Sequence, residues 1–297
     1  MFVSSNVKNE VRGMNKEFFN SIEKETYTKR FVDPQWMELV QSRADVSGKI
    51  AVDIGAGGGI YSVALAKLGA AKIIGVDISE NMIAGAKENC REYPQISFQV
   101  GTASETNLPG GTVDVLLERA LIHHLKDHQL PECFAEAKRI LNENGVFIIQ
   151  DRTIEDCSLA GSDEHIRGYF FEFYPELLKK DIARRHSADT INAYLSEAGF
   201  QHVEVLPFWE NRKAYHSLDE LKQEIISRKG RSILFELNDE QVQILADGIG
   251  ERVTKSFPVV EKERWTIWFA RANDILGGTG AAAGDDYASG FGFPRVN

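Results

Sequence analysis

Glycines and carboxylates that could bind a nucleoside stand close together near the start of the sequence. Residues 50–54 form an apolar run that ends in a glycine-rich segment, residues 55–59, and an amphipathic segment follows. Glycine lets the backbone approach a ligand without a Cβ clash, and a helix that starts after such a turn presents unpaired N–H groups. A second apolar run ends in Asp77, where the next parallel strand would bring a carboxylate to the ribose of the same ligand. The spacing therefore predicts a nucleoside site.

The spacing of the glycines restricts which nucleoside this would be. A dinucleotide fingerprint has the pattern G-x-G-x-x-G, and counting from Gly55 and Gly57 puts Ile60 where the third glycine belongs. NAD and FAD are therefore disfavoured. The pattern here is G-x-G-x-G, with Gly59 as the third glycine and Asp53 two residues before the first.

Together with Asp77, this pattern resembles that of the class I S-adenosylmethionine-dependent methyltransferases. The resemblance implies that the glycine turn abuts the methionine part of the cofactor, that Asp77 takes the ribose hydroxyls and that no pyrophosphate is held. A glycine turn alone would also suit an ordinary strand-to-helix connection. The acids near the turn are what favour cofactor binding.

The resemblance continues through the next two strands. Residues 77–82 match the family's D-[IVL]-S-x-x-M form, in which Ile78 and Met82 would flank the adenine. After the third expected strand, Thr102 stands where the family often has an acid, and Ala103 follows it. The cofactor contacts that the resemblance implies are Asp53, Gly55, Ala56, Gly57, Gly59, Asp77, Ile78, Met82, Thr102, Ala103 and Glu118.

Residues 118–125, Glu-Arg-Ala-Leu-Ile-His-His-Leu, follow the fourth expected strand and resemble the strand ending of many small-molecule methyltransferases. The charged pair Glu118 and Arg119 departs from the family pattern, in which small or amide residues are commoner at this place. Glu118 could pair with the ammonium group of the cofactor, or with Arg119 and other neighbours. The sequence is compatible with both arrangements.

The paired histidines, His123 and His124, are compatible with a general base or a metal site. On a helix, His124 and His128 would share one face, which suffices for two metal ligands, but no third or fourth ligand is evident in the sequence. A metal-dependent enzyme is therefore a weaker hypothesis than a methyltransferase, and no metal is predicted. His123 is the first candidate for a general base. Asp151 is the second, because it ends the fifth expected strand on the side of the sheet where ligands bind.

Alternating strands and helices would carry these residues. Apolar runs predict strands at 50–54, 72–76, 96–100, 113–117, 146–150, 200–206 and 265–270, with helical periodicity between most of them. This order predicts an α/β protein. The resemblance makes it the Rossmann-like class I methyltransferase fold, a seven-stranded, mostly parallel sheet with one antiparallel strand and helical cap insertions.

The main domain is expected at residues 48–272, with cap insertions at about 152–188 and 209–263. Residues 1–47 are expected to form N-terminal helices that cover the cofactor, and residues 273–297, rich in Gly and Ala, a flexible tail. The aromatic run at 169–174 would be a lid over an apolar substrate or, as we favour, buried core.

The second insertion contains two capped helices joined by a basic turn. Ser217-x-x-Glu220 is a capping box, and Asn238-x-x-Gln241 is its amide analogue. The turn between these helices, Arg228-Lys229-Gly230-Arg231, could meet an acidic group of the substrate, although a solvated loop is the simpler interpretation. In the resembled family such insertions cover the substrate.

Composition narrows the partners and the compartment. The 297 residues carry 34 Lys and Arg against 44 Asp and Glu, a formal charge of −10, which disfavours a nucleic-acid partner. The three cysteines are widely spaced and are expected to be reduced packing residues. Because no secretory leader or long apolar stretch is evident, we expect a soluble, cytoplasmic protein without a membrane partner.

The predicted function is therefore transfer of a methyl group from S-adenosylmethionine, as methyl donor, to an O, N or C nucleophile of a small molecule. The sequence has no Asn-Pro-Pro-Tyr run at the fourth strand end, where amino-methylating enzymes that act on nucleic acid or protein often have one. The donor is already activated, so the protein mainly has to align it with the acceptor and exclude water. The alternative is a non-catalytic S-adenosylmethionine-binding sensor or assembly module.

Overall fold

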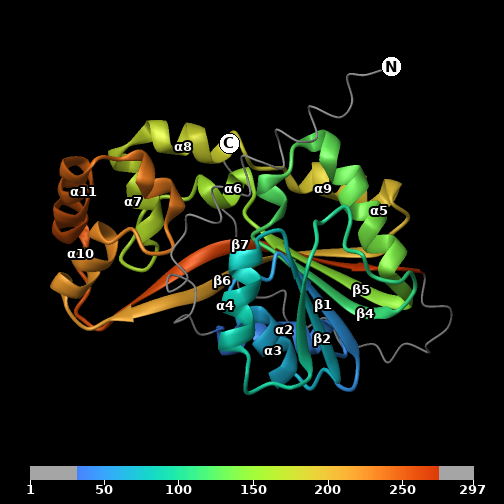
Figure 1. The fold of residues 1–297 in the computed structure, drawn as a ribbon. Helices are drawn as coiled ribbons and strands as arrows, with labels where there is room; N and C mark the ends of the chain where they lie inside the picture. Colours follow the sequence, from blue (N-terminus) through green and yellow to red (C-terminus); the bar gives the residue numbers. More distant parts are fainter. Residues whose placement is uncertain (1–31, 274–297) are drawn as a thin grey trace, which may run out of the picture.

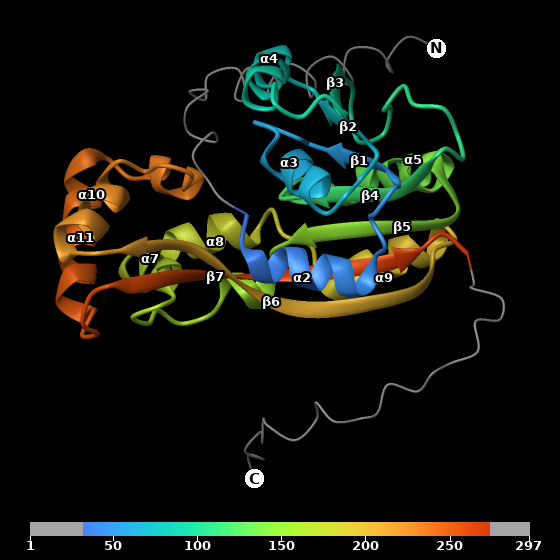
Figure 2. The same cartoon turned by 90° about the horizontal axis from the view of Figure 1, so that it is seen from below.

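The computed structural model describes residues 32–273, which form an α/β fold around one twisted sheet (Figures 1 and 2). The sheet has seven strands in the order β3-β2-β1-β4-β5-β7-β6. All neighbours from β3 to β5 pair in parallel, and β7 pairs antiparallel with both β5 and β6. The predicted fold class is confirmed. The strands are β1 Ile50–Ile54, β2 Lys72–Asp77, β3 Ile96–Val100, β4 Val113–Arg119, β5 Leu141–Asp151, β6 Gln201–Tyr215 and β7 Val259–Arg271.

Helices cover both faces of the sheet. Residues of α2 (Pro34–Arg43) and α3 (Ile60–Lys67) share a buried apolar cluster with one face, and residues of α5 (Leu130–Ile140) and α9 (Ala188–Glu197) share another with the opposite face. The α4 helix (Glu80–Asn89) packs on β2 and β3. Successive residues of β4 alternate between the two clusters, as the pleat of a strand requires.

A second group of helices forms the cap, which lies beyond the ends of the central strands (Figure 1). It comprises α6 (Ile154–Cys157), α7 (Ile166–Phe173), α8 (Pro175–Ile182), α10 (Leu218–Ile226), the 3₁₀ turn η4 (Ser232–Glu236) and α11 (Asp239–Arg252). As predicted, Ser217 and Asn238 cap α10 and α11, because their side chains accept hydrogen bonds from the backbone N–H groups of Glu220 and Gln241.

The cap has an apolar core of its own, and the aromatic run supplies part of it. Tyr169, Phe170 and Phe171 are buried against apolar residues of α10 and α11, such as Leu221 and Leu245. None of the three lines the pocket described below. The interpretation of this run as core is confirmed, and the lid interpretation is wrong.

The hairpin of β6 and β7 is much longer than predicted. The sequence indicated strands only at 200–206 and 265–270, and residues 209–263 were assigned to the cap insertion. The structure instead continues both strands, with pairs from Trp209↔Arg264 to Tyr215↔Val259. The added segments carry many charged residues, so they lack the apolar run by which the central strands are found. The hairpin therefore extends from the sheet into the cap (Figure 1).

The N-terminal helix α2 packs beside the central strands. Trp36 is fully buried, and its indole N–H donates to Gln150 Oε1 at 2.7 Å. No residue of α2 lines the pocket described below. The segment at residues 27–31, which was expected to fold over the cofactor, lies outside the described residues, so this prediction stays untested. The preceding predicted helix and the tail beyond Asn273 lie outside the described residues. No helix within residues 32–273 is long and apolar enough to cross a bilayer.

Candidate active site

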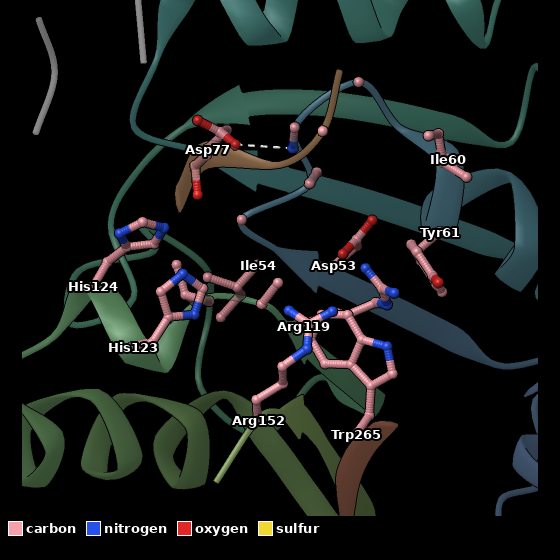
Figure 3. Close-up of a pocket in the computed structure, with 18 of the residues that line it drawn as sticks. Asp53, Ile54, Ile60, Tyr61, Asp77, Arg119, His123, His124, Arg152 and Trp265 are labelled. Atoms are coloured by element: carbon pink, nitrogen blue, oxygen red, sulfur yellow. Dashed lines mark hydrogen bonds between the residues drawn. The ribbon is translucent and has the colours of Figure 1, made fainter. Parts of the chain in front are cut away.

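A pocket of about 330 Å³ lies at the carboxyl ends of β1, β2, β4 and β5 (Figure 3). Ligands of open α/β sheets bind at this edge, and the volume falls within the usual range for small-molecule sites. The strand ends form one wall, and residues on the cap side, among them Arg212 of β6 and Arg231 just before η4, form the other. The site is thus built between the main domain and its cap.

The glycine turn between β1 and α3 exposes its backbone to the pocket. Gly55, Gly57 and Gly59 all have positive φ angles, of 75°, 51° and 82°. A Cβ added at Gly57 would meet only the carbonyl oxygen of Gly55, at 4.0 Å, so a ligand can approach the backbone there. Gly59 does not line the pocket, and its added Cβ would lie 2.6 Å from Cys90 Sγ. The third glycine therefore serves the packing of the turn on α4.

Asp77 ends β2 next to this turn. One of its carboxylate oxygens accepts from the Gly57 N–H and the other from the Ser79 N–H, both at 2.9 Å. Burial raises the pKa of Asp77, and these backbone donors oppose the rise. The carboxylate is therefore held at the rim of the pocket where the predicted ribose would lie.

Most of the predicted cofactor residues surround this part of the pocket. Burial raises the pKa of Asp53 to about 6, against the opposing hydrogen bond from Ser62 Oγ at 2.7 Å. Thr102, which replaces the family's acid, forms a backbone bridge with Glu105. The predicted residues that line the pocket are Asp53, Gly55, Ala56, Gly57, Asp77, Ile78, Met82, Thr102 and Ala103.

Glu118 is, with Gly59, one of the two predicted cofactor residues that do not line the pocket. Its side chain is fully buried on the same side of β4 as Leu116, away from the pocket, and Cys133 Sγ lies 3.4 Å from its carboxyl group. Burial raises the pKa of Glu118 to about 8. The predicted pairings with the ammonium group of the cofactor and with Arg119 are therefore wrong. Strand alternation separates Glu118 from Arg119, which does line the pocket.

The two candidate bases are brought together. Nδ1 of His123 lies 2.8 Å from one carboxylate oxygen of Asp151 and 3.0 Å from the other. Although burial opposes its ionisation, His123 and Arg185 hold the pKa of Asp151 below its usual range. An ionised carboxylate only accepts hydrogen bonds, so Nδ1 of His123 carries the proton. Of the pair, His123 lines the pocket and Asp151 lies behind it.

Burial also keeps His123 neutral. It lowers the pKa of His123 to about 4, and although Asp151 opposes this effect, the positive charge of Arg185 adds to it. Asp151 is itself shared with Arg185, which donates to it at 2.8 Å. A neutral imidazole with a protonated Nδ1 leaves its Nε2 lone pair to accept a proton.

The segment that carries His123 is held by a residue that the sequence interpretation missed. His186 lies with one ring nitrogen 2.9 Å from Asp127 and with the other 3.0 Å from the carbonyl of Ile122. No sequence motif indicates this contact, because His186 stands about sixty positions away. The short 3₁₀ turns η2 (Ile122–His124) and η3 (Asp127–Gln129) are thereby fixed against the start of α9.

The helical face expected for His124 and His128 is absent, because the two residues lie in separate 3₁₀ turns. Within residues 32–273, no group of three or more His, Cys, Asp or Glu side chains is arranged to hold a metal ion. Burial lowers the pKa of His124 to about 3.

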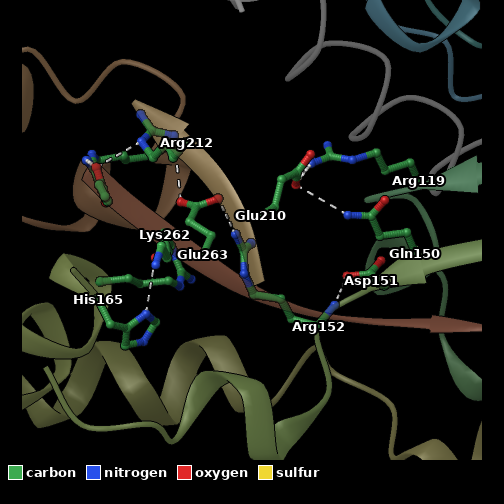
Figure 4. Close-up of polar contacts among 12 residues, drawn as sticks. Arg119, Gln150, Asp151, Arg152, His165, Glu210, Arg212, Lys262 and Glu263 are labelled. Carbon is green, nitrogen blue, oxygen red and sulfur yellow. Dashed lines mark hydrogen bonds and ion pairs between the residues drawn. The ribbon is translucent and has the colours of Figure 1, made fainter. Parts of the chain in front are cut away.

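Arginines dominate the rest of the lining. Arg119 donates to Glu210 at 2.6 Å, and its guanidinium lies over the rings of Tyr61 and Trp265. Arg152 donates to Glu263 at 2.6 Å and stacks on the same indole, 3.6 Å from its centroid (Figures 3 and 4). The sequence interpretation noted only Arg119 and Arg231 among the lining arginines, and it favoured a solvated loop for Arg231, which is 2% exposed and lines the pocket.

Comparison with known proteins agrees with this site. A family model described as a methyltransferase domain matches residues 52–149. Over 109 residues the chain is 37% identical to a ubiquinone biosynthesis O-methyltransferase of Methylococcus capsulatus. The aligned segment covers 35% of this chain and 44% of that protein. Over 133 residues it is 29% identical to a ribosomal protein L11 methyltransferase of Vibrio parahaemolyticus. Here the aligned segment covers 44% of this chain and 42% of that protein. The chain thus spans less than half the length of these relatives.

Solved structures share the fold. Phosphoethanolamine N-methyltransferase 2 of Haemonchus contortus, solved in complex with S-adenosyl-L-methionine, aligns with a TM-score of 0.57 at 18% identity and covers 87% of this chain and 60% of that chain. The glycine turn and Asp77 belong to the matched domain and lie at the carboxyl ends of parallel strands, where open α/β sheets bind ligands. Residues 52–149 are therefore similar to a methyltransferase domain, and the fold around them is that of solved S-adenosylmethionine-dependent methyltransferases.

Proposed function

We propose that this protein transfers the methyl group of S-adenosylmethionine to a hydroxyl group of a small molecule, with His123 as general base. The observation that carries the proposal is the hydrogen bond of His123 with Asp151 at the wall of the pocket. An amine acceptor can attack through its own lone pair, whereas a hydroxyl gains from a base that removes its proton. A buried and oriented imidazole therefore favours oxygen over nitrogen as the nucleophile.

The residues present fit the proposed cofactor. The bare backbone at Gly57 leaves room for its close approach, and Asp77 presents a carboxylate at the position of the ribose. Ile78 and Met82 offer apolar surface for the adenine, and Asp53 places a second acid beside the turn. When bound there, S-adenosylmethionine supplies a methyl group that the positive sulfur has already activated.

The residues of the chain then have separate tasks. His123 Nε2 takes the proton of the acceptor, and Asp151 holds the imidazole in the tautomer and orientation that this needs. Arg212 of β6 and Arg231 of the cap close the pocket opposite the strand ends and help exclude water. The pocket volume of about 330 Å³ supports a small molecule as the acceptor rather than a folded protein surface.

The test is methyl transfer from radiolabelled S-adenosylmethionine to a panel of small phenols, alcohols and amines. We expect the wild type to methylate a hydroxyl compound. The His123→Ala variant should lose about a hundredfold in kcat, within the usual contribution of a general base, while its affinity for S-adenosylhomocysteine stays within about twofold.

His128→Ala is the matched control, because His128 lies five positions away, is exposed and does not line the pocket. It should behave as the wild type. Full turnover by His123→Ala, or transfer to amines alone, would contradict the proposal.

A further inference from the structure

Seven arginines line the pocket: Arg119, Arg152, Arg167, Arg184, Arg185, Arg212 and Arg231. The same lining includes the carboxylates of Glu210 and Glu263, and those of Asp53 and Asp77 at the cofactor position. The whole chain carries a formal charge of −10. This concentration of positive charge is therefore a local property of the pocket.

Carboxylates that balance some of these arginines lie behind them, outside the lining. Asp181 is fully buried and accepts from Arg167 at 2.6 Å and from Arg184 at 2.7 Å. Arg185 donates to Asp181 at 3.0 Å and to Asp151 at 2.8 Å. Three guanidinium groups thus meet two carboxylates, whose pKa values are both held low although burial opposes their ionisation. One positive charge remains at this wall of the pocket.

The lining arginines also have more donors than these carboxylates accept. Within the described residues, six of the seven lining arginines, all but Arg184, have a buried Nε–H group without a hydrogen-bond partner. Burial lowers the pKa of Arg152 to about 10, even though Glu263 lies at 2.6 Å and opposes the change. Buried cations that are incompletely compensated cost free energy, which a bound anion offsets.

We propose that the methyl acceptor carries an anionic oxygen group, a carboxylate or a phosphate, which Arg184 and Arg152 bind beside His123. This inference rests on the proposed function, because it assigns the chemistry of the acceptor in the same pocket. A guanidinium presents a planar pair of donors that matches both kinds of anion. The Arg184 side chain is 31% exposed, whereas the Asp181 that holds it is fully buried. Arg184 therefore keeps accessible surface for a ligand.

The cofactor also has a carboxylate, but it would not account for this set of arginines. Arg119 lies beside the proposed cofactor position, since its guanidinium stacks over Tyr61 of α3, the helix that follows the glycine turn. Arg212 and Arg231 come from the opposite, cap side of the pocket, where Glu261 holds both. Because the arginines line both walls of the pocket, we expect a second anionic group besides the carboxylate of the cofactor.

Binding of simple probes to the full chain tests the proposal. Benzoate and phenyl phosphate are the anionic probes, and benzamide is the neutral analogue of benzoate. Each is titrated by ligand-observed NMR, with and without saturating S-adenosylhomocysteine. We expect both anions to bind at least about tenfold more tightly than benzamide, with an affinity that falls as salt increases. Arg184→Gln should remove most of this preference, and Arg184→Lys, which keeps the charge but not the fork, should retain part of it.

Arg43→Gln is the matched control, because Arg43 is an exposed arginine with one carboxylate partner outside the pocket. It should bind every probe as the wild type does. Equal affinity for benzoate and benzamide, or unchanged anion binding by a folded Arg184→Gln variant, would overturn the inference. So would anions that compete with S-adenosylhomocysteine, since the arginines would then serve the cofactor. Failure of S-adenosylhomocysteine itself to bind would instead contradict the proposed function, and the titrations without it separate the two failures.

Discussion

Nδ1 of His123 lies 2.8 Å from a carboxylate oxygen of Asp151, 28 positions away in the sequence. His123 follows β4, and Asp151 ends the neighbouring parallel strand β5. The register of these two strands pairs Arg119 with Gln150. The backbone N–H of His123 also donates to Asp151, at 3.2 Å. Asp151 therefore orients both the ring and the backbone of His123, which is a positioning role rather than that of the base itself.

Replacing Asp151 by Asn should disturb the orientation of the His123 imidazole and leave cofactor affinity nearly unchanged. An amide can present its NH₂ group to Nδ1, which favours the wrong tautomer of His123, and it leaves Arg185 less compensated. We expect kcat to fall by about a hundredfold, while the affinity for S-adenosylhomocysteine changes by less than about threefold. Steady-state kinetics and calorimetry measure the two quantities. A variant with a lower melting temperature but an unchanged kcat would limit Asp151 to a structural role.

The pH dependence of stability should report the buried, neutral His123. Its folded pKa of about 4 lies below its ordinary value of 6.5, so between these pH values the unfolded chain binds more protons than the folded one. Stability should therefore fall as pH drops from 6.5 towards 4. Between pH 7 and pH 5, the free energy of unfolding should fall by about 2 kcal/mol more in the wild type than in His123→Ala. Urea denaturation at the two pH values measures this difference, and equal losses would contradict it.

Asp77→Ala should weaken the binding of S-adenosylmethionine and S-adenosylhomocysteine by at least about tenfold. The substitution removes the charged carboxylate that would accept hydrogen bonds from the ribose hydroxyls. Because Asp77 also holds the Gly57 and Ser79 N–H groups, Asp77→Asn, which keeps one acceptor oxygen, should lose less. Isothermal calorimetry measures the affinities, with the exposed Asp45→Ala variant as control. Unchanged affinity in a folded Asp77→Ala variant would remove the ribose assignment.

Glu118→Gln should affect stability and leave cofactor affinity alone. The folded pKa of Glu118, about 8, lies above its ordinary value of 4.5, so the folded chain binds the extra proton between these pH values. The resulting stability is present below about pH 4.5 and is lost as pH rises towards 8. The Gln variant does not titrate, so its stability relative to the wild type should rise by about 3 kcal/mol on going from pH 5 to pH 8. A weakened affinity for S-adenosylmethionine would restore Glu118 to the cofactor site.

The ion pair of Arg231 with Glu261 joins the cap to the hairpin, and removing only one of its two charges should lower the stability of the protein. Glu261 is fully buried and accepts from both terminal nitrogens of Arg231, at 2.9 and 2.6 Å. Glu261→Gln leaves a buried guanidinium without its full counter-charge and should destabilise the protein by about 3 kcal/mol. Replacing Glu261 and Arg231 together by Met should cost less than that single change. Urea denaturation measures both, and a more damaging double variant would contradict this account.

The sequence predicted the cofactor side of the pocket because its determinants are local. The glycines at 55 and 57 and the carboxylate of Asp77 belong to one strand-turn-helix-strand unit, whose geometry follows from apolar runs and glycine spacing. His123 and Asp151 were found as two separate candidates for one role. Only the register of β4 and β5 shows that they act as a pair.

The acceptor side could not be predicted in the same way. Arg167 and Arg184 come from a cap whose packing has no simple sequence period, and Arg231 belongs to a turn that resembles a solvated loop. By contrast, the position of the Glu118 side chain could have been predicted from the sequence. It has the same parity along β4 as Leu116, so strand alternation places it against α5 rather than in the pocket.

Calorimetric binding of S-adenosylmethionine and S-adenosylhomocysteine to the full chain, with NADH as control, tests the central claim most directly. The account predicts binding of the first two in the micromolar range and none of NADH, because the turn has the G-x-G-x-G spacing and Ile60 stands where a dinucleotide fingerprint needs glycine. Binding of NADH, or no binding of either sulfonium-derived ligand, would contradict the assignment of this pocket to a methyl donor.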